Sequence, residues 1–255
     1  MVSSAEVLIA DCSERRISPY FQAFFRVSSH IATYFCSSLP LIGLCSCVIL
    51  ALYNDFEKAT ETHCHTRNVL PSVSSAIGDF YWGRLIWRTL IFVHILPRIL
   101  AAFAYAKLFT CGLESIVHTI FRYITCFLNL LELFCLLMLS VVSSKDNHFR
   151  HVLAFSVFQV AGMVHGILHI IMYRISGLNN YSPVTRKSYR VKKACYKWSA
   201  LFLIICSFLY YRHNSRCEPY VFSAFAFSEY LVVLTNTCFH ATFRFDFHGL
   251  YIFVF

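Results

Sequence analysis

The sequence predicts an all-α protein: a polytopic membrane helix bundle with about six transmembrane helices and both termini in the cytosol. Three observations predict this class. Hydrophobic residues make up 58% of the 255 residues and charged residues only 14%, against about 25% charged residues in soluble domains. Apolar runs of the length that crosses a bilayer recur along the chain. The few charged residues gather between these runs, which indicates one membrane domain rather than several soluble ones.

Six segments are apolar over about 20 residues or nearly so, the length of a helix that crosses a bilayer. The fifth is the shortest, and we keep it because its removal would place both flanking loops on one side of the membrane. One transmembrane domain, residues 31–243, is therefore predicted between an amino-terminal tail, 1–30, and a carboxy-terminal tail, 244–255. The predicted spans are 31–53, 85–106, 116–142, 150–173, 197–211 and 220–243.

Basic residues predict the orientation. The loop 174–197 is rich in arginine and lysine, and the amino-terminal tail carries Arg15, Arg16 and Arg26. Positive residues favour cytosolic loops, so this loop and both termini are predicted to be cytosolic. The same bias explains the net charge of +9, and we predict no nucleic-acid partner. The predicted lumenal loops are 54–84, 143–149 and 212–219.

The twelve cysteines do not indicate a zinc ribbon or a dense disulfide framework. Seven lie within apolar runs, where free cysteine behaves as a small hydrophobic residue, and the chain has no C-x-x-C pair. Cys64 and Cys217 are the only cysteines in the predicted lumenal loops. They can form a bridge in an oxidising lumen, or remain two free thiols that lie too far apart to meet. The residues alone leave both alternatives open.

Ionisable and amide side chains recur inside four of the predicted helices. Such residues are costly in a bilayer and are functional candidates by default. They can neutralise and hydrogen-bond one another, or they can line a polar cavity or lipid headgroup site; for the set as a whole we favour the cavity. The residues are His94 and Arg98 in the second span, Asn129 and Glu132 in the third, His165 and His169 in the fourth, and Glu229, Asn236 and His240 in the sixth.

The predicted lumenal ends carry a second polar set. Residues 210–220 read YYRHNSRCEPY and place Arg212, His213, Asn214 and Glu218 at the mouth of the fifth and sixth helices. Arginine binds phosphate through paired donors, which suits an anionic headgroup, whereas anchoring at the membrane interface requires no ligand. Asp146, His148 and His151 lie at the mouth of the third and fourth helices.

The lumenal segment THCHTRNVLPSVSSAIGD, residues 62–79, is polar in an apolar chain. His63, Cys64 and His65 are consecutive, whereas the ligands of a tetrahedral metal site are usually spaced two to four residues apart. No metal site is therefore predicted. The segment lacks the G-x-S-x-G motif of a serine nucleophile, so a serine-rich turn is the expectation for Ser72, Ser74 and Ser75.

Several segments resemble the post-GPI attachment to proteins factor 2 family, part of the wider Frag1/DRAM/Sfk1 group. They are THCHTRNVLPSVSSAIG, PRILAAFAY, RKSY and YRHNSRCEPYVFSAFAFSEYLVVLTNTCFHATF, in the same order and spacing across residues 30–247. The resemblance implies a multi-pass protein of the Golgi and endoplasmic reticulum membranes that remodels the lipid of glycosylphosphatidylinositol (GPI) anchors. The implied reaction reacylates lyso-GPI at sn-2 with a saturated fatty acid during maturation of GPI-anchored proteins. Membrane lipid and lyso-GPI or GPI-anchored proteins are the implied partners.

Two classes of protein agree with this resemblance. The chain is either an O-acyltransferase for lyso-GPI, with an unidentified acyl donor and no predicted cofactor, or a non-catalytic scaffold that presents lyso-GPI to a partner acyltransferase. For the enzyme, His213 or His94 is the candidate general base. A disulfide is expected between Cys64 and Cys217. The candidate headgroup-binding residues are Arg98, Arg212, Asn214, Glu218, Ser72, Ser74, Ser75, Glu132, His165, Glu229 and His240.

Overall fold

The computed structural model describes residues 25–110, 115–248 and 251–254. Among these residues, six helices are long and apolar enough to cross a membrane, which confirms the predicted all-α membrane bundle. Most of the expected amino-terminal tail lies outside the described residues. The six helices are α2 (Ser29–Asn54), α5 (Tyr81–Leu108), α6 (Ile116–Val141), α7 (His148–Ile175), α9 (Pro183–Arg216) and α10 (Val221–Ala241).

Six short elements connect or extend these helices. The strands β1 (Phe25–Ser28) and β2 (Tyr251–Val254) pair in antiparallel fashion and form a small ribbon beside the bundle. This ribbon is a local exception to the predicted all-helical fold. The short helices are α3 (Phe56–Thr60), α4 (Val73–Gly78), α8 (Leu178–Tyr181) and α11 (Phe243–Asp246).

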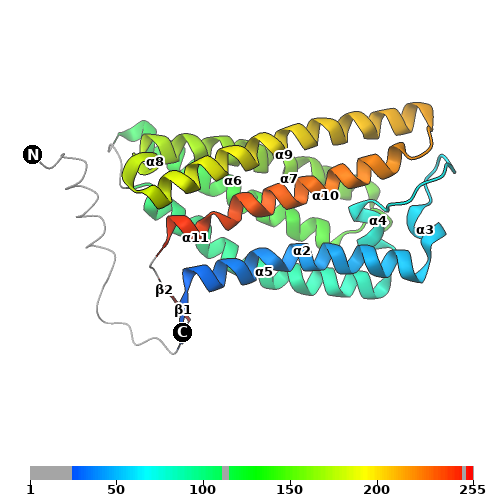
Figure 1. The fold of residues 1–255 in the computed structure, drawn as a ribbon, viewed down its shortest axis with the longest axis horizontal. Helices are drawn as coiled ribbons and strands as arrows, with labels where there is room; N and C mark the ends of the chain where they lie inside the picture. The colour runs from blue at the N-terminus through cyan, green and yellow to red at the C-terminus, as the bar shows by residue number, and fades with distance from the viewer. Residues whose placement is uncertain (1–24, 111–114, 249–250, 255) are drawn as a thin grey trace, which may run out of the picture.

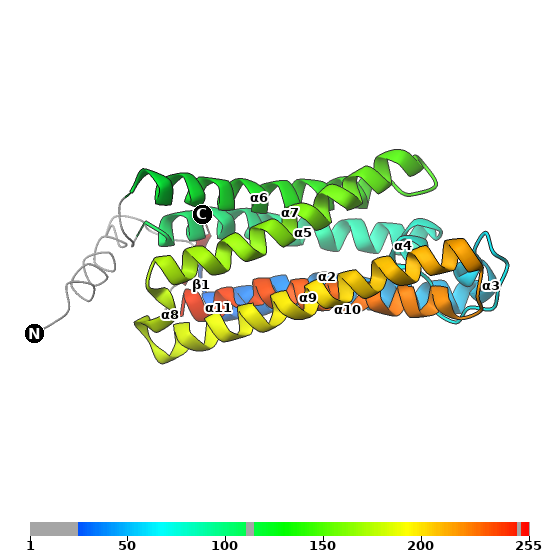
Figure 2. The same cartoon turned by 90° about the horizontal axis from the view of Figure 1, so that it is seen from above.

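The six long helices form a ring that follows the order of the chain (Figure 1, Figure 2). α2 packs against α5, α5 against α6, and α6 against α7, while α9 packs against α10 and α10 returns to α2. α7 and α9 close the ring through a weaker contact. Because neighbours in the chain are neighbours in space, short connections suffice between most helices.

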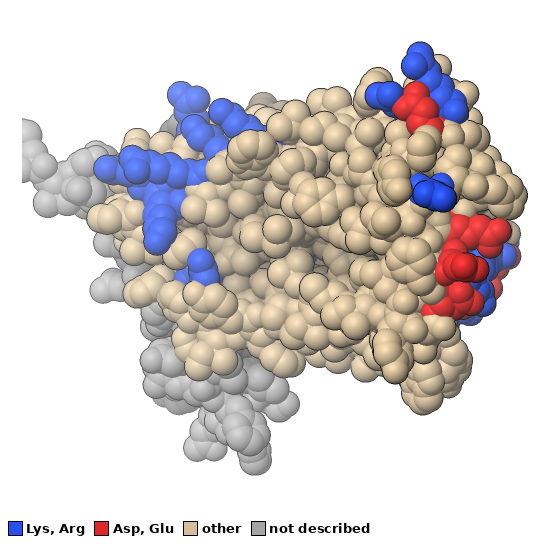
Figure 3. All heavy atoms as spheres, turned by 45° about the vertical axis from the view of Figure 1, so that its right-hand side comes forward, with Lys and Arg blue, Asp and Glu red and all other residues tan. Residues whose placement is uncertain are grey.

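The two ends of the ring differ in their short elements and in their charged side chains. We call the end with α8, α11 and the start of α9 the basic end, and the end with α3, α4 and the α9–α10 turn the disulfide end. On the face that Figure 3 shows, lysine and arginine gather at the basic end, both signs of charge gather at the disulfide end, and the surface between carries neither. Large apolar side chains such as Phe92, Phe127 and Ile204 are exposed, as the side chains of a membrane-embedded bundle are.

The fifth long helix begins earlier than the sequence-based prediction. Residues 174–197 were expected as a loop, but α9 already begins at Pro183. Ser182 accepts a hydrogen bond from the Thr185 backbone nitrogen, and the Thr185 hydroxyl accepts one from the Ser182 backbone nitrogen. This capping box, with proline at the first helical position, starts a helix strongly. The basic residues that follow are good helix formers.

The basic end contains a buried ion pair that holds α11 against the bundle. The side chain of Lys192 in α9 is buried and forms an ion pair and a hydrogen bond with Asp246 of α11. The Lys192 ammonium also donates to Ser188 at 3.0 Å and to Thr242. The Tyr173 hydroxyl donates to Asp246 Oδ1 at 2.8 Å. Lys192 is therefore not one of the solvated cations that the basic pattern indicated.

Two apolar cores fill the ring and leave a polar layer between them. The core near the disulfide end includes Trp87, Ile91 and Leu133. The core near the basic end includes Phe109 and Met172 together with the buried Tyr173 ring. The polar side chains between these cores form the candidate site.

Candidate functional site

Polar side chains from four helices meet inside the ring, in what we call the Glu132 cluster. The three most central side chains, Arg98, Glu132 and His165, are 7%, 2% and 2% exposed. The stripes predicted on separate helices thus converge, because polar groups in a bilayer lower their cost by contacting one another. The cluster consists of Arg98 of α5, Asn129 and Glu132 of α6, His165 of α7, and Asn236 and His240 of α10.

The Glu132 carboxylate is the centre of these contacts. Its Oε1 atom accepts a hydrogen bond from Asn236 Nδ2 at 3.1 Å, and it lies 3.4 Å from His240 Nε2 and 3.8 Å from Arg98 Nη2. Its Oε2 atom lies 3.6 Å from His165 Nδ1. Within the described part of the chain, neither Oε2 nor His165 Nδ1 has a hydrogen-bond partner. One oxygen of the Glu132 carboxylate therefore has a hydrogen-bond partner and the other, among the described residues, has none.

Arg98 supplies the positive charge that offsets Glu132. Its Nη2 atom donates to Asn129 Oδ1 at 3.2 Å and lies 3.0 Å from His240 Nε2. The cluster thus holds a cation, a carboxylate and two imidazoles in an interior with little water. Such a group can accept a proton and can stabilise an oxyanion.

A pocket between α7, α9 and α10 reaches this cluster from the side. Asn236 and His240 line it, together with Gly166 and Tyr196. A Cβ atom at position 166 would lie 2.9 Å from the Tyr196 ring, so glycine is what allows this aromatic side chain to pack against α7. The pocket lies where the ring has its weakest helix contact.

Sequence reasoning named Asn236 and His240 but missed the pocket residues on α7 and α9, although a signal was present on α7. Gly162 and Gly166 form a G-x-x-x-G spacing on α7, which in membrane helices marks a face where a neighbour approaches closely. Gly162 indeed faces Glu132: a Cβ there would lie 3.4 Å from the carboxyl carbon. Tyr196 gave no such signal, because it lay in the segment expected to be a loop.

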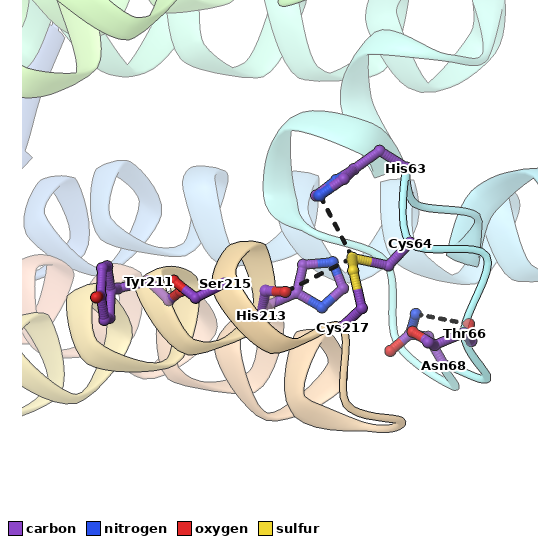
Figure 4. The surroundings of a disulfide bond; sticks show 8 residues. All are labelled: His63, Cys64, Thr66, Asn68, Tyr211, His213, Ser215 and Cys217. Atoms are coloured by element: carbon purple, nitrogen blue, oxygen red, sulfur yellow. Dashed lines mark hydrogen bonds between the residues drawn. A yellow bond between two sulfur atoms is a disulfide. The ribbon is translucent and has the colours of Figure 1, made fainter.

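The expected disulfide is present at the other end of the ring. Cys64 and Cys217 are bonded, with their Cα atoms 5.3 Å apart, which confirms the bridge and removes the alternative of two free thiols. Figure 4 shows the His213 and His63 rings next to the bridge, with His213 on the last turns of α9 and His63 in the loop before α4. The His213 ring is 1% exposed and meets the His63 ring edge-on at 5.4 Å.

The predicted base His213 is thus buried next to the disulfide. Neither of its ring nitrogens has a hydrogen-bond partner among the described residues. It belongs to the disulfide end, whereas the Glu132 cluster lies well inside the helices. The two predicted sets of polar residues therefore form two separate places in the fold.

Residues 55–80, which we call the connecting segment, fold back onto α10. The backbone nitrogens of Val69 and Leu70 both donate to Ser223 Oγ, at 2.8 and 3.3 Å. The backbone nitrogen of Val73 donates to Glu229 at 3.0 Å. With the disulfide, these contacts tie the segment to the α9–α10 hairpin, so that it covers the disulfide end of the ring.

The three serines predicted as headgroup contacts have local partners. Ser72 caps α4 by accepting from the Ser75 backbone nitrogen at 3.1 Å. Ser74 lies 3.2 Å from the Ser72 hydroxyl, and the Ser75 hydroxyl donates to the Ala59 carbonyl at 3.1 Å. These contacts agree with the expected serine-rich turn.

The charged residues at the disulfide end are also paired. Arg212 forms an ion pair with Glu218 at 2.5 Å, and Arg216 lies 3.8 Å from the same carboxylate. Asn214 is exposed beside them. In the α6–α7 turn, hydrogen bonds from Ser143 hold the pKa of the Asp146 carboxyl below its usual range. This end therefore presents paired charges at the surface.

Two further predicted residues lie apart from the Glu132 cluster. His94 is directed toward α2, where its Nδ1 atom lies 2.8 Å from the Cys36 carbonyl oxygen. That contact identifies the proton on Nδ1 and leaves His94 as a link between two helices. Glu229 serves the connecting segment, as described above. The rotation of α5 and α10 about their own axes decides which neighbour His94 and Glu229 face.

The fold and the site together define a class of protein. Six apolar helices surround a buried group of charged and amide side chains that a lateral pocket reaches. The chain is accordingly a multi-pass membrane protein with a polar site inside its helix bundle.

Known proteins resemble this chain over most of its length. The family model described as Frag1/DRAM/Sfk1/Cwh43P N-terminal domain matches residues 28–250. A Caenorhabditis elegans protein named post-GPI attachment to proteins factor 2 is 37% identical over 83% of this chain and 82% of its own. A Drosophila pseudoobscura pseudoobscura protein of the same name is 34% identical over 92% of each chain. A Xenopus tropicalis protein named acyltransferase PGAP2 is 36% identical over 82% of this chain and 84% of its own.

These matches confirm the family that the sequence motifs indicated. The chain belongs to the post-GPI attachment to proteins factor 2 family, within the Frag1/DRAM/Sfk1 group. No solved structure matches it.

Proposed function

We propose that this protein acts in the fatty-acid remodelling of GPI anchors and reacylates lyso-GPI at sn-2 with a saturated fatty acid. The names of its relatives support the pathway, since they include post-GPI attachment to proteins factor 2 and acyltransferase PGAP2. The observation that carries the reaction is the Glu132 cluster: a carboxylate, two imidazoles and an arginine in the bundle interior, next to a lateral pocket.

The chemistry of acyl transfer matches what this cluster contains. The free sn-2 hydroxyl must lose a proton as its oxygen attacks the acyl carbonyl carbon, and the carbonyl oxygen becomes negative. The bond from that carbon to the sulfur or oxygen of the acyl donor then breaks, and the donor's thiol or alcohol leaves with the proton. The group of Glu132 and its two histidines activates the hydroxyl, while Arg98 and Asn236 donate hydrogen bonds to the oxyanion. We assign this role to the cluster rather than to His213 or His94, because His240 lines the pocket whereas the other two histidines do not.

The pocket suits a lipid that enters sideways from the bilayer. It opens between helices rather than at an end of the ring, and its walls include apolar and small side chains such as Phe239 and Gly162. The pocket has a volume of only about 20 Å³, so α7 and α9 must separate before the glycerol of a lysolipid can enter it while the acyl chain stays among the surrounding lipids.

We propose a matching orientation and location. The disulfide end faces the lumen, where an oxidising environment maintains the Cys64–Cys217 bond, and the basic end faces the cytosol. The protein then resides in Golgi and endoplasmic reticulum membranes, where lyso-GPI is exposed on the lumenal leaflet. An introduced glycosylation site in residues 55–62 should be modified, and one in residues 186–193 should not.

A reconstituted assay tests the reaction. Purified protein in lipid nanodiscs is given lyso-GPI and a saturated acyl donor, either the acyl thioester of coenzyme A or a saturated phospholipid. We expect acylated product, lost in His240→Gln and Arg98→Gln and retained in His148→Gln, which changes an exposed histidine at the disulfide end.

The outcomes separate the two classes of function. Loss of transfer in His213→Gln, with full activity in His240→Gln, would place the reaction at the disulfide end. If clean, folded protein bound lyso-GPI but transferred no acyl group with either donor, a scaffold that presents lyso-GPI to a partner acyltransferase would replace the enzyme.

A further inference from the structure

We propose that Glu132, His165 and His240 bind one divalent transition-metal ion, for which zinc is the best match. Their ligand atoms, one from each side chain, all lie within 4.8 Å of one another. Two histidines and one glutamate make up the protein ligands of one known type of catalytic zinc site, in which the fourth position stays open. The metal site stands on its own geometry; its use in acyl transfer rests on the function proposed above.

The distances match metal ligands better than hydrogen bonds. His165 Nδ1 lies 3.6 Å from Glu132 Oε2, and His240 Nε2 lies 3.4 Å from Glu132 Oε1. A hydrogen bond between such atoms is usually 2.7–3.2 Å long. Two ligands of a tetrahedral zinc ion, each about 2.1 Å from the metal, lie about 3.4 Å from each other. The two distances involve different oxygens of the carboxylate, and the ligand atoms as a set lie within 4.8 Å of one another, so the side chains must move closer together to bind one ion.

Unpaired atoms provide a second and independent observation. Glu132 Oε2 and His165 Nδ1 face each other, each side chain is 2% exposed, and neither atom has a hydrogen-bond partner among the described residues. A buried polar atom without a partner costs about 1–3 kcal/mol. A bound cation would satisfy both atoms at once.

Arg98 is the feature that a metal must accommodate. Its Nη2 atom lies 3.0 Å from His240 Nε2, the same atom that would bind the ion. On metal binding this contact is lost, and Arg98 keeps Asn129 Oδ1 as its acceptor at 3.2 Å. The ion and Arg98 together outweigh the single negative charge of Glu132, so the open position should hold an anionic oxygen. Asn236, which lines the pocket beside His240, can donate a hydrogen bond to that oxygen.

A second cluster of potential metal ligands in the fold is not proposed as a metal site. His63, Cys64 and His213 also bring ligand atoms within 4.8 Å of one another. The sulfur of Cys64 is bonded to Cys217, however, and zinc requires a thiolate.

Metal analysis of the purified protein tests the site. The full chain is purified in detergent without chelators, incubated with zinc, passed over a desalting column and measured for metal by mass spectrometry. We expect about one zinc ion per chain, and loss of that zinc in Glu132→Gln, His165→Gln and His240→Gln. His169→Gln is the matched control, since His169 is equally buried on α7, one turn from His165, and is not a ligand.

Spectroscopy keeps the test decisive if a variant fails to fold. Cobalt replaces zinc in the wild-type protein, and its visible absorption reports ligand number and type without any mutation. Intense bands of a four-coordinate nitrogen and oxygen site support the proposal. Wild-type protein that retains only traces of zinc and gives the spectrum of aqueous cobalt would overturn it, as would zinc retained in all three ligand variants.

The metal site and the proposed reaction can fail separately. Zinc bound through Glu132, His165 and His240 in a protein that transfers no acyl group would leave the site standing and overturn the reaction. Full acyl transfer by protein from which the metal has been removed would overturn the use of the metal in the reaction and leave the reaction standing, while the metal analysis above still decides whether the site binds zinc.

Discussion

The Glu229 carboxylate of α10 accepts a hydrogen bond, 3.0 Å long, from the backbone nitrogen of Val73 at the start of α4. This contact joins a membrane helix to a segment 156 residues earlier in the chain. It gives a half-buried carboxylate one of the partners that it needs, and it holds the connecting segment over the disulfide end.

Removal of this acceptor should release the connecting segment. We expect Glu229→Ala to cost about 1.5–3 kcal/mol, the range for hydrogen bonds to charged groups, and to speed protease cleavage within residues 55–80. Glu229→Gln should lose less, since its amide oxygen still accepts. Glu57→Gln, at an exposed glutamate of the same segment, serves as the control. Equal cleavage rates in Glu229→Ala and the wild type would contradict this role.

The Cys64–Cys217 disulfide should stabilise the same end of the ring. It closes a loop with a sequence separation of 153 residues, and loss of a native disulfide typically costs about 2–5 kcal/mol. Cys64→Ser should therefore lower the unfolding temperature in detergent. Thiol labelling of the unfolded chain should reveal two additional reactive cysteines after reduction. The exposed free Cys45 provides the control variant, Cys45→Ser. An unchanged label count on reduction would rule out the bridge.

The buried Lys192–Asp246 pair should matter more than its surface neighbours. Lys192→Met leaves the Asp246 carboxylate without its cation, and breaking a buried pair in this way costs about 3–5 kcal/mol. The adjacent Lys193 is exposed, so Lys193→Met should change stability by less than about 1 kcal/mol. The measurement is the free energy of unfolding in detergent for both variants. Similar losses in the two variants would show that net charge, rather than the pair, stabilises the basic end.

The close contact of Gly166 with Tyr196 should be sensitive to a single methyl group. In Gly166→Ala the new Cβ would lie 2.9 Å from the Tyr196 ring, and overpacking of this kind costs about 1–3 kcal/mol. Tyr196→Leu, combined with Gly166→Ala, should recover part of the loss because the ring no longer blocks the methyl.

Gly162 offers a comparison on the same helix. A Cβ there would meet Glu132 at 3.4 Å, an ordinary contact, so Gly162→Ala should unfold at nearly the wild-type temperature. If Gly166→Ala and Gly162→Ala lowered the unfolding temperature equally, the cause would be the loss of glycine itself rather than the packing of Tyr196.

Sequence reasoning predicted that the polar residues of the four helices would converge, but not which of these residues would contact one another. Arg98, Glu132, His165 and His240 meet as expected, because four helices with polar faces must direct them inward. His94 was predicted together with Arg98 in the polar set of the second span, yet it contacts Cys36 on α2. One turn of helix separates these residues in the sequence, and the small rotation that separates their partners is set by packing against neighbours.

The sequence by itself determined the membrane class, the number of spans and the family. These properties depend on composition, on the length of apolar runs relative to a bilayer, and on motifs that are read along the chain. Tertiary structure alone decided that Lys192 is buried, that α9 begins at Pro183 rather than near residue 197, and that Glu132, His165 and His240 lie within ligand distance of one another. The physical reason is that such contacts join helices far apart in the sequence, and their geometry depends on the rotation and tilt that close packing imposes.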